Sequence, residues 1–395
     1  MYDDDRRFRF LLTLIVVPSV IILTAYSVMA FGGARGTPAS GPSQVVVAPS
    51  GGVALAPPNL AAPPAATTPA QTTSNLAKAQ PGATTAPAMP EMSGMAAGQP
   101  AATAQAAPAA APHTPSDAAL PVLLPLVPGT TNVRTLALAA SDEVIQIADG
   151  VSFQAWTFGG IVPGPVVHIK QGDTVKFTLT NNGKMPHSID FHAAQVPPDQ
   201  DYVDVKPGES KSFDWTADYP GVFMYHCGSP LVIAHMASGM YGAVVVDPAT
   251  PLPAAREYVI VQSEFYTTGK EGGVQQVDIN KVQNGSPDYV VFNGYANQYK
   301  ETPLTAKAGE LVRFYIVNAG PNGFSAFHVV GTIFENAYAD GNTANAQHGM
   351  QTVTIPPGGG YMVEFTIPHP GSYAFVTHSF SGVNKGAIGV LKVTQ

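Results

Sequence analysis

The chain has 395 residues, among them 37 prolines and 39 glycines, and its formal net charge is −8 at pH 7. Lysines and arginines do not cluster anywhere after the first nine residues, which excludes a basic surface for nucleic acid. The single cysteine, Cys227, excludes an intramolecular disulfide framework.

The N-terminal segment is apolar enough to cross a membrane. Phe10 to Phe31 forms a run of 22 residues without a charged side chain, which matches a bilayer core about 30 Å thick. Three arginines precede this run, so the positive-inside rule places everything after it outside the cytoplasm. Small residues near its end leave a cleaved signal peptide open as the alternative. We therefore expect residues 1–31 to be a membrane anchor or a signal segment.

Residues 32–120 have the composition of a disordered linker. Alanine, proline, threonine, glycine and glutamine dominate them, and they show no apolar periodicity with which to bury a core. Met89, Met92 and Met95 fall three apart within this stretch, and thioethers bind Cu(I). We favour chance spacing in a low-complexity segment as the explanation for these methionines.

The rest of the chain predicts two homologous β-sandwich domains, at 121–250 and 251–395. Short runs rich in valine, phenylalanine, threonine and tyrosine alternate with turn residues at the spacing of strands. The second domain repeats the first: QGDTVKF at 171–177 matches AGELVRF at 308–314, and YPGVFMYHC at 219–227 matches HPGSYAFVT at 369–377. A proline-rich stretch at 247–253 marks the boundary.

A copper-binding pattern surrounds the cysteine of the first domain. Cys227 is followed by His235 and Met240, and His187 lies at the end of an earlier predicted strand. One thiolate, two imidazoles and a weak thioether form the ligand set of blue copper. The second domain has Thr377 in place of the cysteine and Ala387 in place of the methionine. The fold class that we predict is therefore all-β, with two tandem cupredoxin-like Greek-key β-sandwiches, and blue copper only in the first.

A second, histidine-only metal site is predicted from strand geometry. Successive side chains of a strand point to opposite faces, so His226 cannot easily serve the metal of Cys227. His192 separates from His187 by the same reasoning, and His378, just past the counterpart of Cys227, is the best candidate for a third imidazole. Asp190 and His328 are candidates for groups that deliver protons to a ligand on that metal. A turn-capping aspartate and a buried structural histidine are the alternative readings of these two residues.

Over residues 130–395, the blocks HSIDFHAA, MYHC, AHMASGMYGA, FSAFHVVGTIF and HSFSGVNKGAIGVLKV resemble the copper-containing nitrite reductases. The resemblance implies a periplasmic homotrimer that reduces nitrite to nitric oxide with one electron and two protons. It implies one type 1 and one type 2 copper per subunit and a proton-delivering pair, Asp190 and His328. The implied type 1 ligands are His187, Cys227, His235 and Met240, and the implied type 2 ligands are His192, His226 and, from a neighbouring subunit, His378.

Several features leave the substrate and the electron donor open. The loops after His192 and His378 and the ligand loop CGSPLVIAH depart from common family forms. Since the chain has no CxxCH motif for haem attachment, we expect a separate donor, such as a cytochrome c or a small cupredoxin. The alternatives are an electron-transfer cupredoxin with the blue site alone, or a multicopper oxidase-like protein acting on another small substrate. A laccase-like trinuclear cluster is disfavoured, because the chain has no His-x-His pair.

Overall fold

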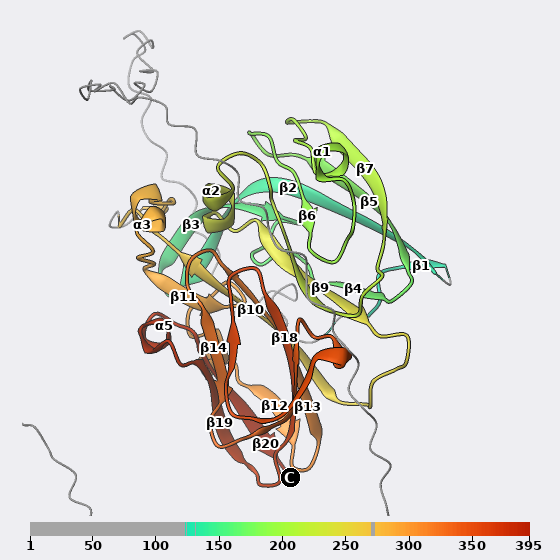
Figure 1. Cartoon of the computed structure of the whole chain (residues 1–395). Coiled ribbons are helices and arrows are strands. Elements are labelled where there is room, and N and C mark those ends of the chain that lie inside the picture. Colours follow the sequence, from blue (N-terminus) through green and yellow to red (C-terminus); the bar gives the residue numbers. More distant parts are fainter. Residues whose placement is uncertain (1–122, 124, 131, 270–272) are drawn as a thin grey trace, which may run out of the picture. The chain divides into compact units, whose positions relative to one another are not determined.

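The computed structural model describes residues 123, 125–130, 132–269 and 273–395, which fall within one compact unit (Figure 1). The predicted anchor at 1–31 and the predicted linker at 32–120, with its three methionines, lie outside the described residues. Within the described part of the chain, no helix is long and apolar enough to cross a membrane.

The first domain consists of two sheets packed face to face. One has the strand order β1-β2-β5-β7, with β3 paired to β2, and the other has the order β4-β9-β8-β6. The strands are β1 (Gly129–Thr130), β2 (Val133–Ala148), β3 (Val151–Phe158), β4 (Val167–Lys170), β5 (Thr174–Asn181), β6 (Asp190–Phe191), β7 (Ser210–Thr216), β8 (Gly221–His226) and β9 (Tyr241–Asp247), with the short helices α1 (Pro198–Asp201) and α2 (Val232–Ala237).

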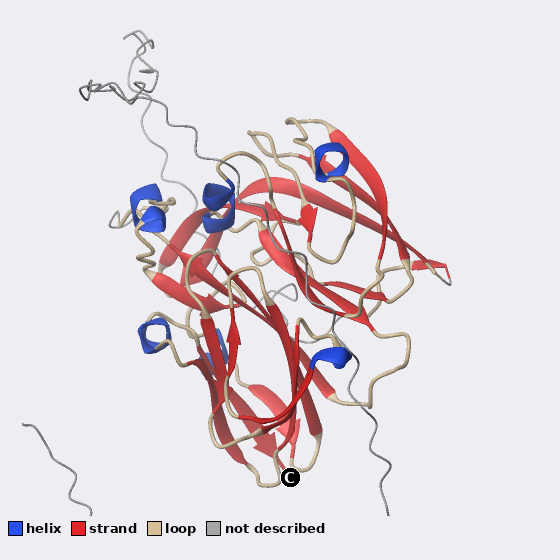
Figure 2. Ribbon diagram, viewed as in Figure 1, coloured by secondary structure: helices blue, strands red, loops and turns tan. Residues whose placement is uncertain are grey.

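The second domain repeats this plan with one more strand in each sheet, in the orders β11-β10-β13-β18-β15-β16 and β12-β20-β19-β14-β17. Strands dominate both domains and the helices are short (Figure 2). The strands of the second domain are β10 (Arg256–Phe265), β11 (Tyr289–Phe292), β12 (Leu304–Lys307), β13 (Leu311–Gly320), β14 (Ser325–Val329), β15 (Phe334–Ala339), β16 (Ala346–Met350), β17 (Val353–Ile355), β18 (Gly360–Thr366), β19 (Gly371–Thr377) and β20 (Ile388–Thr394), with α3 (Ile279–Gln283), α4 (Gln298–Glu301), α5 (Phe380–Asn384) and the 3-10 turn η2 (Thr343–Asn345).

In a strand that borders solvent, buried and exposed side chains alternate along the chain. In β5, Val175, Phe177 and Leu179 are buried, whereas Lys176 between them is exposed, as expected for a strand with one wet face. By contrast, β10 is buried along most of its length. One of its faces joins the core of the second domain and the other joins a core that both domains share. At this shared core, β8 contacts β13 and β18 of the second domain, and β9 contacts β10 and β13.

The predicted all-β fold with two cupredoxin-like domains is confirmed. The duplication extends to strand pairing, since β2 runs parallel to β5 as β10 runs parallel to β13. Strand β9 of the first domain ends at Asp247 and β10 of the second begins at Arg256. The predicted boundary at 250/251 falls in the connection between them.

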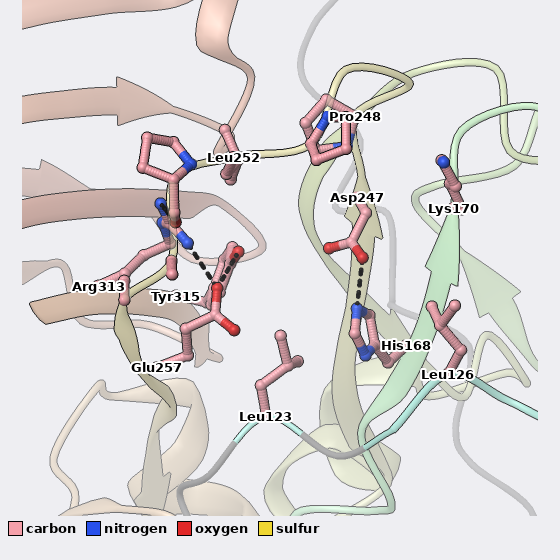
Figure 3. Close-up of a pocket in the computed structure, with 14 residues that line it drawn as sticks. Leu123, Leu126, His168, Lys170, Asp247, Pro248, Leu252, Glu257, Arg313 and Tyr315 are labelled. Carbon is pink, nitrogen blue, oxygen red and sulfur yellow. Dashed lines mark hydrogen bonds and ion pairs between the residues drawn. The ribbon is translucent and has the colours of Figure 1, made fainter. Parts of the chain in front are cut away.

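A buried ion-pair network ties this connection to the second domain. The guanidinium of Arg313, which is 1% exposed, donates to Glu364 Oε1 at 2.7 Å, to Glu257 Oε1 at 2.6 Å and to the Pro253 carbonyl at 3.0 Å. A cavity of about 440 Å³ adjoins the network (Figure 3). On its opposite side His168 contacts Asp247 at 2.9 Å.

Replacing Arg313 with methionine should lower the free energy of unfolding by about 3 kcal/mol, because Glu364 would remain buried without its cation. The measurement is urea denaturation followed by tryptophan fluorescence. Arg256→Met is the control, since Arg256 is 46% exposed in its pair with Glu310 and should contribute less than about 1 kcal/mol. Equal losses from both variants would contradict the assigned role of the buried network.

Candidate metal centres

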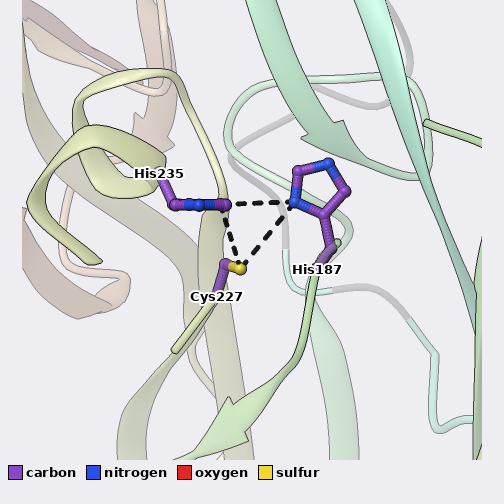
Figure 4. Close-up of side chains that lie close together, drawn as sticks. All are labelled: His187, Cys227 and His235. Carbon is purple, nitrogen blue, oxygen red and sulfur yellow. Dashed lines mark hydrogen bonds between the residues drawn. The ribbon is translucent and has the colours of Figure 1, made fainter. Parts of the chain in front are cut away.

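A buried cluster in the first domain brings one sulfur and two imidazole nitrogens together (Figure 4). The Sγ atom of Cys227 lies 3.2 Å from His235 Nδ1 and 3.9 Å from His187 Nδ1. The two Nδ1 atoms are 3.3 Å apart. All three residues are buried, so these potential ligand atoms converge away from solvent.

Two segments of the first domain hold this cluster, the one that precedes β6 and the one that joins β8 to β9. His187 precedes β6 and exchanges two backbone hydrogen bonds with Val205, at 3.1 and 2.8 Å. Cys227 follows β8, and its N–H donates to the carbonyl of Met240 at 3.1 Å. His235 lies in α2, and Met240 precedes β9 with its side chain fully buried in the same core as Cys227.

The surroundings of the cluster favour a bound copper ion. Burial and then the neighbouring His235 lower the pKa of His187 to about 4, and burial likewise lowers the pKa of His235. Both imidazoles are therefore neutral near pH 7, which is the form that binds metals. The backbone N–H of Ser188 donates to Cys227 Sγ at 3.4 Å and so supports a thiolate. A thiolate with two neutral imidazoles is a donor set that suits copper.

A second cluster lies at the surface on the other side of the same strand. His226 Nε2 is 3.1 Å from His192 Nε2 and 3.8 Å from Asp190 Oδ2. The pairing of β6 with β8 sets Asp190 directly opposite His226. The other ring nitrogen of His226 lies 2.9 Å from the carbonyl of Cys227, so its Nδ1–H donates there and Nε2 is left for a metal.

The two remaining histidines of the prediction lie together in the second domain. His328 is on β14 and His378 follows β19, with their ring centroids 5.1 Å apart. His328 Nδ1 is hydrogen-bonded to the carbonyl of Gln351, and Phe380 packs edge-on against His378 at 4.9 Å. Neither histidine belongs to the group formed by Asp190, His192 and His226 among the described residues. A single chain therefore holds these residues in two separate groups.

The second domain keeps the backbone frame of the buried cluster without its ligands. Thr377 N–H donates to the Ala387 carbonyl at 3.4 Å, as Cys227 does to Met240. The Thr377 hydroxyl accepts from Ala326 N–H at 3.1 Å, where Cys227 Sγ accepts from Ser188. Ala387 N–H donates to the Gly382 carbonyl at 3.0 Å, whereas Met240 donates to His235 at 3.1 Å. Glycine thus stands where the first domain has a histidine ligand candidate.

Two contacts of the buried cluster were not predicted from the sequence. The indole of Trp156 packs on His235 at 4.9 Å and on His187 at 5.8 Å between ring centroids. The Ser188 N–H contact with sulfur is the other. Trp156 lies on β3, far from the ligand loops in sequence, and no motif marks it. Ser188 follows a predicted ligand, and its equivalence to Ala326 in the repeat is a signal that could have been used.

Fold and sites together define a two-domain cupredoxin of the multicopper oxidase class. Multicopper oxidase family models match residues 139–251 and 256–393. The copper-containing nitrite reductase of Neisseria gonorrhoeae is 42% identical over 260 residues, which cover 64% of this chain and 66% of that protein. The copper-containing nitrite reductase of Pseudomonas chlororaphis is 30% identical over 294 residues, covering 68% and 80%.

Solved structures agree with these relatives. The copper nitrite reductase of Nitrosomonas europaea superposes with a TM-score of 0.63 at 41% identity, over 67% of this chain and 94% of that one. The enzyme of Thermus scotoductus gives a TM-score of 0.62 at 35% identity, over 66% and 62%. The chain belongs to the family of copper-containing nitrite reductases. The family models and these relatives support copper as the metal that the chain binds.

Proposed function

We propose that this protein reduces nitrite to nitric oxide: nitrite, one electron and two protons give nitric oxide and water. The observation that carries the proposal is the placement of two separate ligand clusters on consecutive residues, His226 and Cys227. An electron carrier with the blue site alone would not need the second cluster. The names of the relatives supply the substrate.

The residues divide into two ligand sets, with one type 1 and one type 2 copper per subunit. His187, Cys227, His235 and Met240 form the proposed type 1 set, and His192, His226 and His378 of the partner subunit form the proposed type 2 set. The separation of His378 from the other two within one chain supports a site completed between subunits. When bound, copper would accept and pass on the electron at the first site and bind nitrite at the second.

The chain itself supplies the electron path and the protons. One peptide unit joins Cys227 to His226, so the clusters are linked through covalent bonds. Asp190 Oδ2 lies 3.8 Å from His226 Nε2 and would protonate a nitrite oxygen. His328, whose ring lies against that of His378, would provide the second protonating group, and loss of water then leaves nitric oxide.

The assembly and its location follow from the same proposal. A homotrimer in the periplasm, joined to the inner membrane by residues 1–31, or released if they are cleaved, would receive electrons from a cytochrome c or a small cupredoxin. The linker at 32–120 would let the enzyme reach such a donor at a distance from the membrane. In denitrification, the enzyme would then carry out the dissimilatory step from nitrite to nitric oxide.

The experiment that tests this function is electron paramagnetic resonance with copper quantification on the purified chain, followed by nitrite and a reducing donor. The expected result is two coppers per chain, a type 2 signal that nitrite perturbs, and nitric oxide production. One copper per chain with a type 1 signal alone would indicate an electron carrier. Two intact signals without turnover would indicate another substrate.

Met240→Leu should raise the reduction potential of the type 1 site, because a thioether that stabilises the oxidised ion is lost. A rise on the order of 60 mV would change the electron equilibrium tenfold. Redox titration of the blue absorption measures it, and the type 2 signal serves as the internal control. An unchanged potential would remove Met240 from the ligand set.

A further inference from the structure

The second domain contacts strand β8 through backbone groups as well as through the apolar core that the two domains share. The N–H of Val222, near the start of β8, donates to the carbonyl of Asp340 at 2.8 Å. A Cβ atom added to Gly360 would lie 2.1 Å from the Val222 carbonyl oxygen, and one added to Gly341 would lie 2.7 Å from the Val222 nitrogen. Only glycine permits this approach. The strand that ends in His226 and precedes Cys227 is therefore fixed directly against the second domain.

The turn that leads into β18 also reaches the exposed cluster. A Cβ atom on Gly358 would lie 3.4 Å from Cε1 of His192 and 3.6 Å from Cε of Met224. Gly358 has a φ of +81°, a conformation that side chains disfavour. The backbone of Gly358 therefore lies beside the imidazole, and a Cβ atom added there would be in van der Waals contact with the ring.

Hydrogen bonds tie the turn to the second domain. Gly358 N–H donates to the carbonyl of Asn318 at 2.7 Å. The amide of Asn318, a fully buried residue, donates in turn to Ile355 at 2.9 Å. On the other side, His192 N–H donates to Met224 of β8 at 3.0 Å. The backbone of His192 is thus bonded to β8, and its exposed ring lies beside a turn of the other domain in the same chain.

We propose that the Gly358 turn, residues 356–360, is a positioning element for the type 2 copper site, setting the His192 ring against that of His226. The inference rests on the proposed function, which makes these two imidazoles ligands. It assigns the second domain a role within its own subunit, besides providing His378 to a partner. Residues that orient a ligand in this way change metal affinity about tenfold to a hundredfold when they are replaced.

The test compares Gly358→Asn with Gly309→Asn in the full chain. Asparagine tolerates a positive φ, so little backbone strain is added at either position. Gly309 has a φ of +79° and nothing within 4 Å of a new Cβ, which makes it a matched control. Gly358→Asn should alter the type 2 paramagnetic resonance spectrum and weaken type 2 copper binding about tenfold. Its blue absorption should stay unchanged, and Gly309→Asn should change neither property.

Two outcomes would overturn the inference. A type 2 spectrum and copper affinity that match the parent in Gly358→Asn would show that the turn does not position His192. Equal changes in both variants would indicate a general effect of placing asparagine at a position with positive φ. Failure of the proposed function is distinguishable, because the parent chain itself would then either lack a type 2 signal or show both signals without forming nitric oxide from nitrite.

Discussion

Cys227→Ser should abolish both the blue absorption and nitrite-dependent nitric oxide formation, while the type 2 signal remains. A serine hydroxyl stays protonated at neutral pH, and its oxygen cannot replace the soft thiolate ligand that copper prefers here. It would also interrupt the route by which an external electron reaches His226. The measurements are the visible spectrum, copper content and the steady-state rate with a reducing donor.

The repeat supplies a matched control for this variant. Thr377 occupies the position of Cys227 in the second domain and accepts the equivalent hydrogen bond, from Ala326 at 3.1 Å. Thr377→Ser keeps the hydroxyl and should leave copper content, colour and rate near those of the parent. Blue colour that survives in Cys227→Ser would exclude this residue as the sulfur ligand.

Asp190→Asn should retain both copper signals and lower turnover by about a hundredfold or more, the usual contribution of a general acid. An amide has nearly the same shape as the carboxyl group but cannot donate a proton to nitrite. Asp190 is partly exposed, with 36% of its side chain accessible, so the substitution should cost little stability. Single-turnover nitric oxide formation separates this effect from delivery of the electron.

Asp214→Asn provides the comparison for that prediction. Asp214 is exposed on β7, outside both clusters, and its replacement should leave the rate unchanged. A parent-like rate in Asp190→Asn would remove this carboxylate from the proposed proton delivery. A lost type 2 signal would instead indicate that Asp190 helps to hold the metal.

Much of the candidate site is local in sequence. Cys227, His235 and Met240 fall within one loop between neighbouring strands, so their spacing alone suggests that they meet. The parity of β8 separates His226 from Cys227 for the same local reason. The structure places these two residues in different clusters, although the identity of the ligands stays a prediction until copper is measured.

The sequence by itself determined the all-β class, the duplication and the presence of a cysteine-centred site in one domain only. These features depend on side-chain alternation and on the comparison of two repeats, which need no knowledge of packing. Tertiary structure decided that Trp156 covers the buried imidazoles, that His378 lies apart from His192, and that Gly358 contacts the His192 ring. Such contacts join residues far apart in the chain, and only the packing of sheets and domains against one another brings them together.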